Sequence, residues 1–409
     1  MSSLRCDTKI EVSKKNIFFR SIDILIPFLL LIFLIGVVGV VTPNYFNYIS
    51  ATPVFEIFFI FTCALSIKTY PKKFLVFAFL YSMYLFYYIV ASYFIDKKSF
   101  MDVAISIKSF VYLIMLGFVS NKKIMNCNIL EIFFHAILFL MVVKYSYSVF
   151  FGFSTRPGIF LENNFEILFI SIIAIGVWEA RGFVRYSEIF FLFVVAALSG
   201  SKSGILEISV VILFAFYNKI FSTRNIIRFF LLIILASVLA FLAMLMIFLK
   251  IGEGGLEGID RYLFLSVFLD ETRSWNFGSW IMGASPLTEL SGFSCDKLIY
   301  YDELFSHKND GSCFSVVLHS MHLRMVFDHG VVGLLAIFLG IIQLCHLANL
   351  SKIFQSSLVA VLVINGLSIS SYNSVYFVLA LALCILTKSE ANGFFTRNRS
   401  ESLIKRFLT

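Results

Sequence analysis

The chain has 409 residues, of which 59% are hydrophobic and 14% are charged, and its mean hydropathy is +0.91. This apolar content exceeds that of a soluble globular domain and indicates an integral membrane protein. The formal net charge of +8 does not indicate nucleic-acid binding, because the basic residues lie between hydrophobic runs and form no patch. The runs are long and do not alternate polar with apolar residues, which excludes an outer-membrane β-barrel.

The hydrophobic runs predict an all-α polytopic membrane protein with about twelve transmembrane helices and one large outer loop. Basic residues precede the first run and no small-residue cleavage site follows it, a pattern typical of an uncleaved signal anchor. We predict a cytoplasmic tail over 1–20, transmembrane helices 1–9 over 21–250, the large loop over 251–324, transmembrane helices 10–12 over 325–387, and a second tail over 388–409. The predicted spans are 21–41, 52–67, 74–94, 103–120, 129–151, 165–178, 188–199, 204–217, 229–250, 325–347, 355–369 and 374–387.

Loop charge predicts the orientation of these spans. Cytoplasmic connections of membrane proteins are enriched in Lys and Arg. In this chain, connections rich in Lys and Arg alternate with connections that are poor in them. Both termini are therefore expected in the cytoplasm, and the stretch 251–318 is expected outside. That stretch carries ten acidic residues against four Lys and Arg, a net charge of −6.

Between predicted spans 5 and 6, residues 154–164 form a short polar segment. Arg156 could bind a phosphate through two parallel hydrogen bonds. A Pro-Gly pair follows it and favours a sharp turn, and Asn163 or Asn164 could cap the next helix. The alternative for Arg156 is an interfacial side chain that reaches lipid phosphates.

The connection between predicted spans 7 and 8 reads Ser199-Gly-Ser-Lys-Ser-Gly204. It places Lys202 on the outer face, against the charge bias, beside small hydroxyl residues and a helix N-terminus that favour anions. The nearest following carboxylate, Glu207, is five residues after Lys202, whereas side chains that face each other on a helix are three or four residues apart. A local ion pair is therefore a poor explanation for Lys202. A lysine that reaches the lipid headgroups is the alternative.

The long outer loop adds a second arginine and two cysteines. Arg261 is a further candidate phosphate ligand. Trp275 and Trp280 suit either the headgroup zone or the face of a sugar. Cys295 and Cys313 are the only cysteines of the loop, and we predict a disulfide between them if the loop faces an oxidising compartment.

A histidine-rich segment joins the loop to the next predicted span. His319 and His322, three residues apart, could share a helix face and bind zinc, but no third ligand and no HExxH or CxxC pattern accompanies them. We therefore predict no metal and no cofactor. A neutral imidazole that accepts a proton from a hydroxyl is the functional interpretation, and a structural histidine in a cap or interfacial belt is the alternative.

Several ionisable residues fall within predicted spans, where such groups are costly and often functional. Glu131 and His135 are four residues apart and could form a proton relay. Structural pairing is the favoured interpretation, because many of these groups lie near predicted span ends. The residues are Glu56, Lys108, Glu131, His135 and Lys144.

The outer segments, taken in this order, resemble the O-antigen polymerase and O-antigen ligase superfamily of bacterial inner membranes. The resemblance covers the whole predicted topology and is sharpest at His319-x-x-x-Leu323 followed by Asp328-x-Gly330-x-x-Gly333. These residues are similar to the family pattern of His-Asn-x-x-Leu, an acidic residue, Gly and Gly. Ser201-Lys202-Ser-Gly204 is similar to the family's Ser-Arg-Gly turn, with Lys where Arg is usual.

The resemblance implies a metal-independent polytopic glycosyltransferase with a glycosyltransferase type C-like fold. Its substrates would be undecaprenyl pyrophosphate-linked glycans at the periplasmic face. A sugar hydroxyl must displace the lipid pyrophosphate, so the site needs a base and cations. His319 is expected as the base, Arg156 and Arg261 with Lys202 at the pyrophosphate, and Asp328 as a group that orients an imidazole. The other expected substrate-binding residues are Glu162, Asn163, Asn164, His322 and Arg324.

Within this superfamily we predict an O-antigen polymerase, which joins lipid-linked repeat units. An O-antigen ligase, which transfers finished glycan to lipid A core, is the first alternative. A non-enzymatic flippase for lipid-linked oligosaccharide is the second and would line its bundle with more ionisable residues. The expected partners are the glycan donor and acceptor, membrane lipid, a chain-length regulator and a flippase, with no nucleic acid.

Overall fold

The computed structural model describes residues 15–41, 51–64, 71–120, 122–152, 154, 156–160, 163–222 and 260–388. Within these ranges the chain is helical, and two isolated bridges are its only β-type pairing. The prediction of an all-α protein is thus confirmed for the described residues. Glu162, the predicted span 229–250, the start of the predicted loop at 251–259, and residues 1–14 and 389–409 of the predicted tails lie outside them.

The described helices coincide with the predicted spans and differ from them by a few residues at the ends, where helix assignments are least sharp. The short helical turns η4 (Lys72–Phe74), η5 (Val90–Ile95) and η9 (Ser371–Asn373) extend or precede them. The bundle helices are α1 (Lys15–Val41), α2 (Ala51–Ala64), α3 (Leu75–Ile89), α4 (Phe100–Val119), α5 (Cys127–Phe150), α6 (Asn163–Arg181), α7 (Tyr186–Leu198), α8 (Lys202–Ser222), α13 (Met321–Leu347), α14 (Lys352–Gly366) and α15 (Val375–Leu386).

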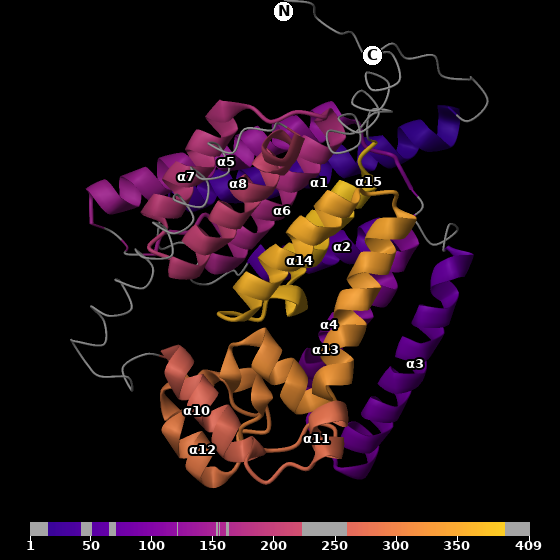
Figure 1. The fold of residues 1–409 in the computed structure, drawn as a ribbon, viewed down its shortest axis with the longest axis vertical. Coiled ribbons are helices and arrows are strands. Elements are labelled where there is room, and N and C mark those ends of the chain that lie inside the picture. The colour runs from indigo at the N-terminus through magenta and orange to yellow at the C-terminus, as the bar shows by residue number, and fades with distance from the viewer. Residues whose placement is uncertain are drawn as a thin grey trace, which may run out of the picture.

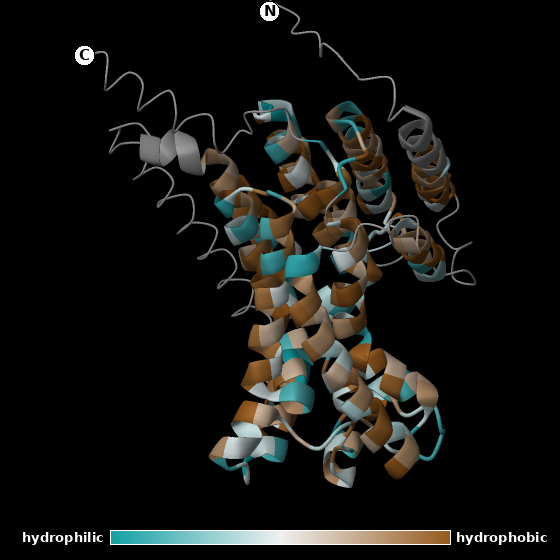
Figure 2. Ribbon diagram, turned by 90° about the vertical axis from the view of Figure 1, so that its right-hand side faces the viewer, coloured by the Kyte–Doolittle hydropathy of each residue, from teal (hydrophilic) through white to brown (hydrophobic). Residues whose placement is uncertain are grey.

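Five helical segments of the described chain are long and apolar enough to cross a membrane: Lys72–Ile95, α4, α5, α6 and α13. Figure 2 shows hydrophobic residues along most of the length of the bundle. The shorter apolar helices include the 12-residue α15, which at 1.5 Å per residue is about 18 Å long and falls short of a hydrocarbon core of roughly 30 Å. The protein is therefore a helical membrane protein, and the count of twelve crossings stays a prediction.

Two helices form the centre of the bundle (Figure 1). Every residue of α15 is buried, and α6 is buried from Glu166 to Arg181. Their sequences are apolar on nearly all faces, as expected for helices surrounded by others. By contrast, α3 exposes one apolar face, with Phe79, Met83 and Phe86 more than half exposed, and this face suits contact with lipid.

A small helical subdomain lies at one end of the bundle (Figure 1). It contains α10 (Asp260–Thr272), α11 (Phe277–Met282), α12 (Gly292–Lys297), η7 (Ile299–Leu304) and η8 (Ser315–Leu318). Phe264, Phe268 and Leu318 form part of its separate apolar core. The structure has a disulfide between Cys295 and Cys313, with the two Cα atoms 5.8 Å apart, so the predicted pair is joined inside this subdomain.

Helix α13 connects the subdomain to the bundle and is broken at Gly330, where φ is +67°. A Cβ atom at Gly330 would lie 2.1 Å from the carbonyl oxygen of Ile281 in α11, so only glycine fits this close approach. Helix α13 begins at Met321, inside the predicted loop, and its first half still packs on the subdomain core, so the predicted loop boundary at residue 324 stays a prediction.

The connection between α3 and α4, together with the first turn of α4, holds the subdomain against the bundle. The Asp102 carboxylate accepts a hydrogen bond from Ser306 Oγ at 2.9 Å and lies 2.7 Å from Nδ1 of His307. Lys98 Nζ lies 2.5 Å from Glu289 Oε1. This connection was predicted to share a face with the long loop, and the structure brings the two together at one end of the molecule.

Candidate anion-binding cavity

A cavity of about 310 Å³, here called the cationic cavity, lies where the subdomain meets the bundle. Segments far apart in the sequence line it: the residues before and at the start of α6, the turn before α8, the subdomain, and the residues after α14. Among the residues singled out from the sequence, Arg156, Asn164, Lys202, Arg261 and His319 lie in this lining. The other lining residues are Gly200, Ser201, Asp260, Phe264, Tyr301, Ser368 and Ile369.

The segment that carries Arg156 is fixed by a buried carboxylate. Glu166, in the first turn of α6, accepts hydrogen bonds from the backbone N–H groups of Ile159 at 2.7 Å and Phe160 at 2.6 Å. Helix α1 also packs closely on this segment, because a Cβ atom at Gly39 would lie 2.0 Å from the Ile159 carbonyl oxygen. The backbone beside Arg156 is therefore held in place by contacts from two helices.

The turn that carries Lys202 is built on Ser201. Ser201 Oγ accepts a hydrogen bond from the backbone N–H of Gly204 at 3.0 Å and so caps the start of α8. The same hydroxyl donates to Asn164 Oδ1 at 2.6 Å. Asn163 Nδ2 donates to the carbonyl oxygens of Pro157 and, at 3.2 Å, of Ser199. The two asparagines thus connect the Arg156 segment to the Lys202 turn.

The described part of the lining carries three cationic side chains, Arg156, Lys202 and Arg261, and one carboxylate, Asp260, a formal excess of two positive charges among these residues. Partial burial first, and then the like charge of Arg156, lower the pKa of Arg261, whereas Asp260 raises it. Among the described residues, neither Arg156 nor Arg261 forms an ion pair with a carboxylate. Such a cavity favours an anion.

His319 lies at a sharp turn between η8 and α13. Its φ of +46° is unusual for a residue other than glycine, and such backbone conformations cost about 1–3 kcal/mol and cluster at functional sites. Its ring packs against Phe264 at 5.4 Å and Tyr301 at 5.3 Å between centroids. Burial lowers the pKa of His319, and Asp260 partly offsets this effect. The imidazole is therefore neutral at neutral pH and able to accept a proton.

Asp260 and Tyr301 line the cavity but were not identified as site residues from the sequence. The Tyr301 hydroxyl lies beside the Asp260 carboxylate, and burial together with this carboxylate raises the pKa of Tyr301 to about 12. Asp260 therefore interacts with Tyr301, His319 and Arg261. The only sequence signal for a role of Asp260 in this cavity is that it directly precedes Arg261.

Four of the expected site residues that the structure describes do not line the cavity: Asn163, which holds the Arg156 segment, and Asp328, Arg324 and His322. Asp328 accepts a hydrogen bond from Ser315 Oγ at 2.6 Å and lies 3.8 Å from Nε of Arg324. Arg324 also donates to the Ile105 carbonyl oxygen at 2.6 Å. Asp328 makes no hydrogen bond or ion pair with a described imidazole, so the expectation that it orients one is corrected: Asp328 and Arg324 form a buried pair within α13.

His322 is turned toward the bundle. Its Nε2 donates to the Val363 carbonyl oxygen at 2.9 Å, and its Nδ1 lies 3.2 Å from the Tyr372 hydroxyl. A Cβ atom at Gly366 would meet this ring at 2.7 Å. His322 therefore packs α13 against α14, and the zinc alternative with His319 has no geometric support among the described residues.

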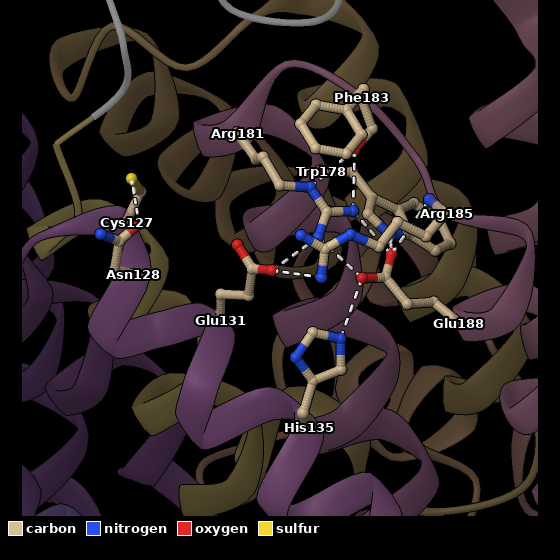
Figure 3. Close-up of polar contacts among 9 residues, drawn as sticks. All are labelled: Cys127, Asn128, Glu131, His135, Trp178, Arg181, Phe183, Arg185 and Glu188. Atoms are coloured by element: carbon tan, nitrogen blue, oxygen red, sulfur yellow. Dashed lines mark hydrogen bonds and ion pairs between the residues drawn. The ribbon is translucent and has the colours of Figure 1, made fainter. Parts of the chain in front are cut away.

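A second charged site, here called the Arg181 cluster, lies between α5, α6 and α7 and is drawn in Figure 3. Arg181 donates to Glu188 from both terminal nitrogens at 2.7 Å and to Glu131 at 3.1 Å. His135 Nε2 lies 3.0 Å from Glu188, and Arg185 lies 2.6 Å from Glu131. Ligand atoms of Glu131, His135 and Glu188 lie within 4.8 Å of one another, as in a metal site, but the guanidinium of Arg181 already bridges the two carboxylates.

The remaining charges named within predicted spans also have partners. Lys108 pairs with Glu56, which accepts a further hydrogen bond from the Tyr112 hydroxyl at 3.1 Å. Lys144 donates to the Gly39 carbonyl oxygen at 2.8 Å. These contacts are those of structural pairing, which was the favoured interpretation.

No protein-family model, no curated protein and no solved structure matches this chain. The resemblance to O-antigen polymerases and ligases stays a prediction.

Proposed function

We propose that the protein is an O-antigen polymerase, which joins undecaprenyl pyrophosphate-linked oligosaccharide units at the periplasmic face of the bacterial inner membrane. The observation that carries the proposal is the meeting of Arg156, Arg261 and His319, from three distant segments, in one cavity with excess positive charge. A pyrophosphate diester is a dianion, and this lining offers it both charge and hydrogen-bond donors. The motif resemblance supplies the substrate class.

The chemistry of glycosyl transfer assigns a role to His319. A hydroxyl oxygen of the acceptor sugar forms a bond to the anomeric carbon of the donor, and the bond from that carbon to the pyrophosphate oxygen breaks. The bonding electrons leave with undecaprenyl pyrophosphate, and the hydroxyl proton moves to the neutral imidazole of His319. A positioned base of this kind contributes about 10²–10⁴ in rate.

The two arginines would stabilise the departing group. The like charges of Arg156 and Arg261 repel each other, so an anion between them is stabilised by both. This stabilisation grows as the bond to the anomeric carbon breaks and negative charge develops on the pyrophosphate. Lys202, in the first turn of α8, adds a third cation beside a helix N-terminus.

The aromatic part of the lining suits a sugar. Phe264 and Tyr301 pack at 5.2 Å between ring centroids and flank His319. Aromatic rings of this kind can cover an apolar sugar face while the phenol remains available for hydrogen bonding. A volume near the lower end for ligand sites fits the reacting sugar and its pyrophosphate, with the rest of each glycan outside.

An O-antigen ligase would use the same chemistry with lipid A core as the acceptor, and it remains the first alternative. A flippase is less favoured. Several described charges between bundle helices are held in ion pairs, such as Lys108 with Glu56 and Arg181 with Glu188, and this pairing does not favour a transport role for them.

The test is the lipopolysaccharide ladder of a deletion strain complemented with His319→Ala. A polymerase predicts one repeat unit on core for both the deletion and this variant, at normal levels of inserted protein. His346→Ala, at an exposed histidine in the last turn of α13, is the matched control and should restore the full ladder. A wild-type ladder with His319→Ala would remove His319 as the base. Loss of all glycan from core, with lipid-linked polymer accumulating, would identify a ligase instead.

A further inference from the structure

A polar cluster lies inside the bundle, below the cationic cavity. Glu207 on α8 and Ser171 on α6 are 0% exposed, and Asn365 on α14 is 1% exposed. The outer ends of α6 and α8 contribute Asn164 and Lys202 to the cavity lining. At 1.5 Å per residue, Glu207 lies about 7.5 Å deeper along α8 than Lys202. The cluster therefore connects α6, α8 and α14, whose ends or following residues line the cavity.

The hydrogen bonding of this cluster has fewer donors than acceptors. Asn365 Nδ2 donates to Glu207 Oε2 at 2.7 Å, and the Ser171 hydroxyl lies beside the same carboxyl group. Among the described residues, Glu207 Oε1, Asn365 Oδ1 and Ser171 Oγ are buried without a hydrogen-bond partner. The first two are acceptors if the carboxyl group is ionised, and the single Ser171 proton can serve only one of them, whereas buried acceptors are rarely left unpaired.

No described cation compensates a charge on Glu207. The ionisable groups of the helices that pack on α8 have other partners or lie far away. On α6, Glu166 binds backbone N–H groups, Glu179 binds Ser351, and Arg181 binds Glu188 of α7. On α14, Lys352 lies thirteen residues from Asn365, about 20 Å along the helix axis. An ionised Glu207 would therefore be an uncompensated charge inside the bundle.

We infer that Glu207 is a proton-binding site, and that its neutral carboxylic acid and the Asn365 amide are joined by two reciprocal hydrogen bonds. Each group carries its two polar atoms on one planar carbon, so a pair joined through Nδ2 and Oε2 can also join through Oε1 and Oδ1. One proton on Oε1 supplies the second donor that the cluster needs, pairs Oε1 with Asn365 Oδ1, and leaves the Ser171 hydroxyl free to donate to the same carboxyl group. The inference does not depend on the proposed glycosyl transfer.

This pair would hold α8 against α14 beneath the cavity and so fix the base of the turn that carries Lys202. Glu166 provides a matched contrast, because its carboxylate accepts two backbone N–H bonds and suits the ionised form. Glutamine is a close mimic of a neutral glutamic acid and a poor mimic of the carboxylate. The substitutions Glu207→Gln and Glu166→Gln should therefore differ in effect.

The direct test is the infrared difference spectrum between wild-type protein and Glu207→Gln, both full-length and in lipid nanodiscs at neutral pH. We expect the variant to lose a C=O stretching band of a protonated carboxylic acid. If the variant loses only carboxylate bands, Glu207 is ionised and the inference is overturned. The same result is expected if a buried water, and not a proton, satisfies Glu207 Oε1 and Asn365 Oδ1.

Thermal unfolding gives a second test. Glu207→Gln can still exchange two hydrogen bonds with Asn365 and should melt close to the wild type, whereas Glu207→Ala and Glu166→Gln should melt several degrees lower. Equal losses for Glu207→Gln and Glu207→Ala would contradict a neutral acid.

The oxygens of Glu207, Asn365 and Ser171 could instead surround a sodium ion. In that case NaCl, compared with choline chloride, would raise the melting temperature of the wild type but not of Glu207→Gln, and the inference would fail.

Discussion

The Arg181 cluster and the cationic cavity arrange their charges in opposite ways. In the Arg181 cluster, each guanidinium contacts a carboxylate and His135 contacts Glu188 (Figure 3). In the cationic cavity, Arg156 and Arg261 form no ion pair with a described carboxylate. The difference separates charges that stabilise the fold from two arginines that are available to a ligand. Substitutions in the two regions should therefore affect different measurements.

The largest effect is expected in the Arg181 cluster. Arg181→Ala leaves the 1% exposed Glu188 carboxylate without its two guanidinium hydrogen bonds. Removing one member of a buried ion pair typically lowers the free energy of unfolding by about 3–5 kcal/mol. The measurement is denaturant unfolding in detergent, beside pyrophosphate binding by the folded fraction, which should not change.

Arg185→Ala is the matched control, because Arg185 is 45% exposed and pairs only with Glu131 among the described carboxylates. Such exposed pairs contribute about 0–1 kcal/mol. If Arg181→Ala were as mild as Arg185→Ala, or abolished pyrophosphate binding, the separation between the two regions would fail.

The disulfide sharpens the comparison, because one wall of the cationic cavity belongs to the subdomain that it closes. Cys295→Ser with Cys313→Ser opens a loop with a sequence separation of 18 and should destabilise the subdomain by about 3 kcal/mol in the chain-entropy model. A reductant should lower the melting temperature of the wild type and leave that of the double variant unchanged. Alkylation of both thiols in unreduced protein from native membranes would show that the bridge is absent.

Arg156→Lys and Arg261→Lys test whether the cavity binds pyrophosphate through its guanidinium groups. Lysine keeps the charge but loses the planar fork, so each variant should bind inorganic pyrophosphate about tenfold more weakly, or about 1.4 kcal/mol. Stability should be unaffected. Arg273→Lys, at an exposed arginine after α10 that does not line the cavity, is the control. Unchanged affinity in both cavity variants would favour arginines that merely reach lipid phosphates.

The smallest effect is expected from Asp260→Asn. Removing the only carboxylate of the described lining should tighten pyrophosphate binding by about 1 kcal/mol or less. Asp260 raises the pKa of His319, so its loss should lower that pKa further, and the acidic limb of the activity profile should move to lower pH. Asp270→Asn, on the same helix but paired with Lys297, is the control. Weaker pyrophosphate binding would indicate that Asp260 serves to hold Arg261.

The sequence predicted the bundle helices because a chain in a membrane must satisfy its backbone within helices, so long apolar runs leave few alternatives. It also predicted Arg156, Lys202, Arg261 and His319, since charged residues on outer connections stand out against an apolar background. Their convergence depends on packing between distant segments, which no local pattern contains. Tyr301 was missed for the same reason, because its contact with Asp260 spans the subdomain.

The misassigned residues show a different limit. Arg324 and Asp328 are four residues apart, a spacing that favours a pair on one helix face, and this signal competed with their place in the motif. The Arg181 cluster could not be predicted from the four-residue spacing of Glu131 and His135 either. The partners of these two residues come from α6 and α7, and the sequence does not specify which faces of neighbouring helices meet.

The close contact of Gly330 with Ile281 has a consequence for repeated use of the site. With no room for even a methyl group between α11 and the break in α13, these helices cannot slide past each other at this point. His319 lies just before α13, so its position along the axis of this helix is fixed relative to α11. Under the proposed polymerisation, a fixed proton acceptor would make each transfer occur in the same register as the one before.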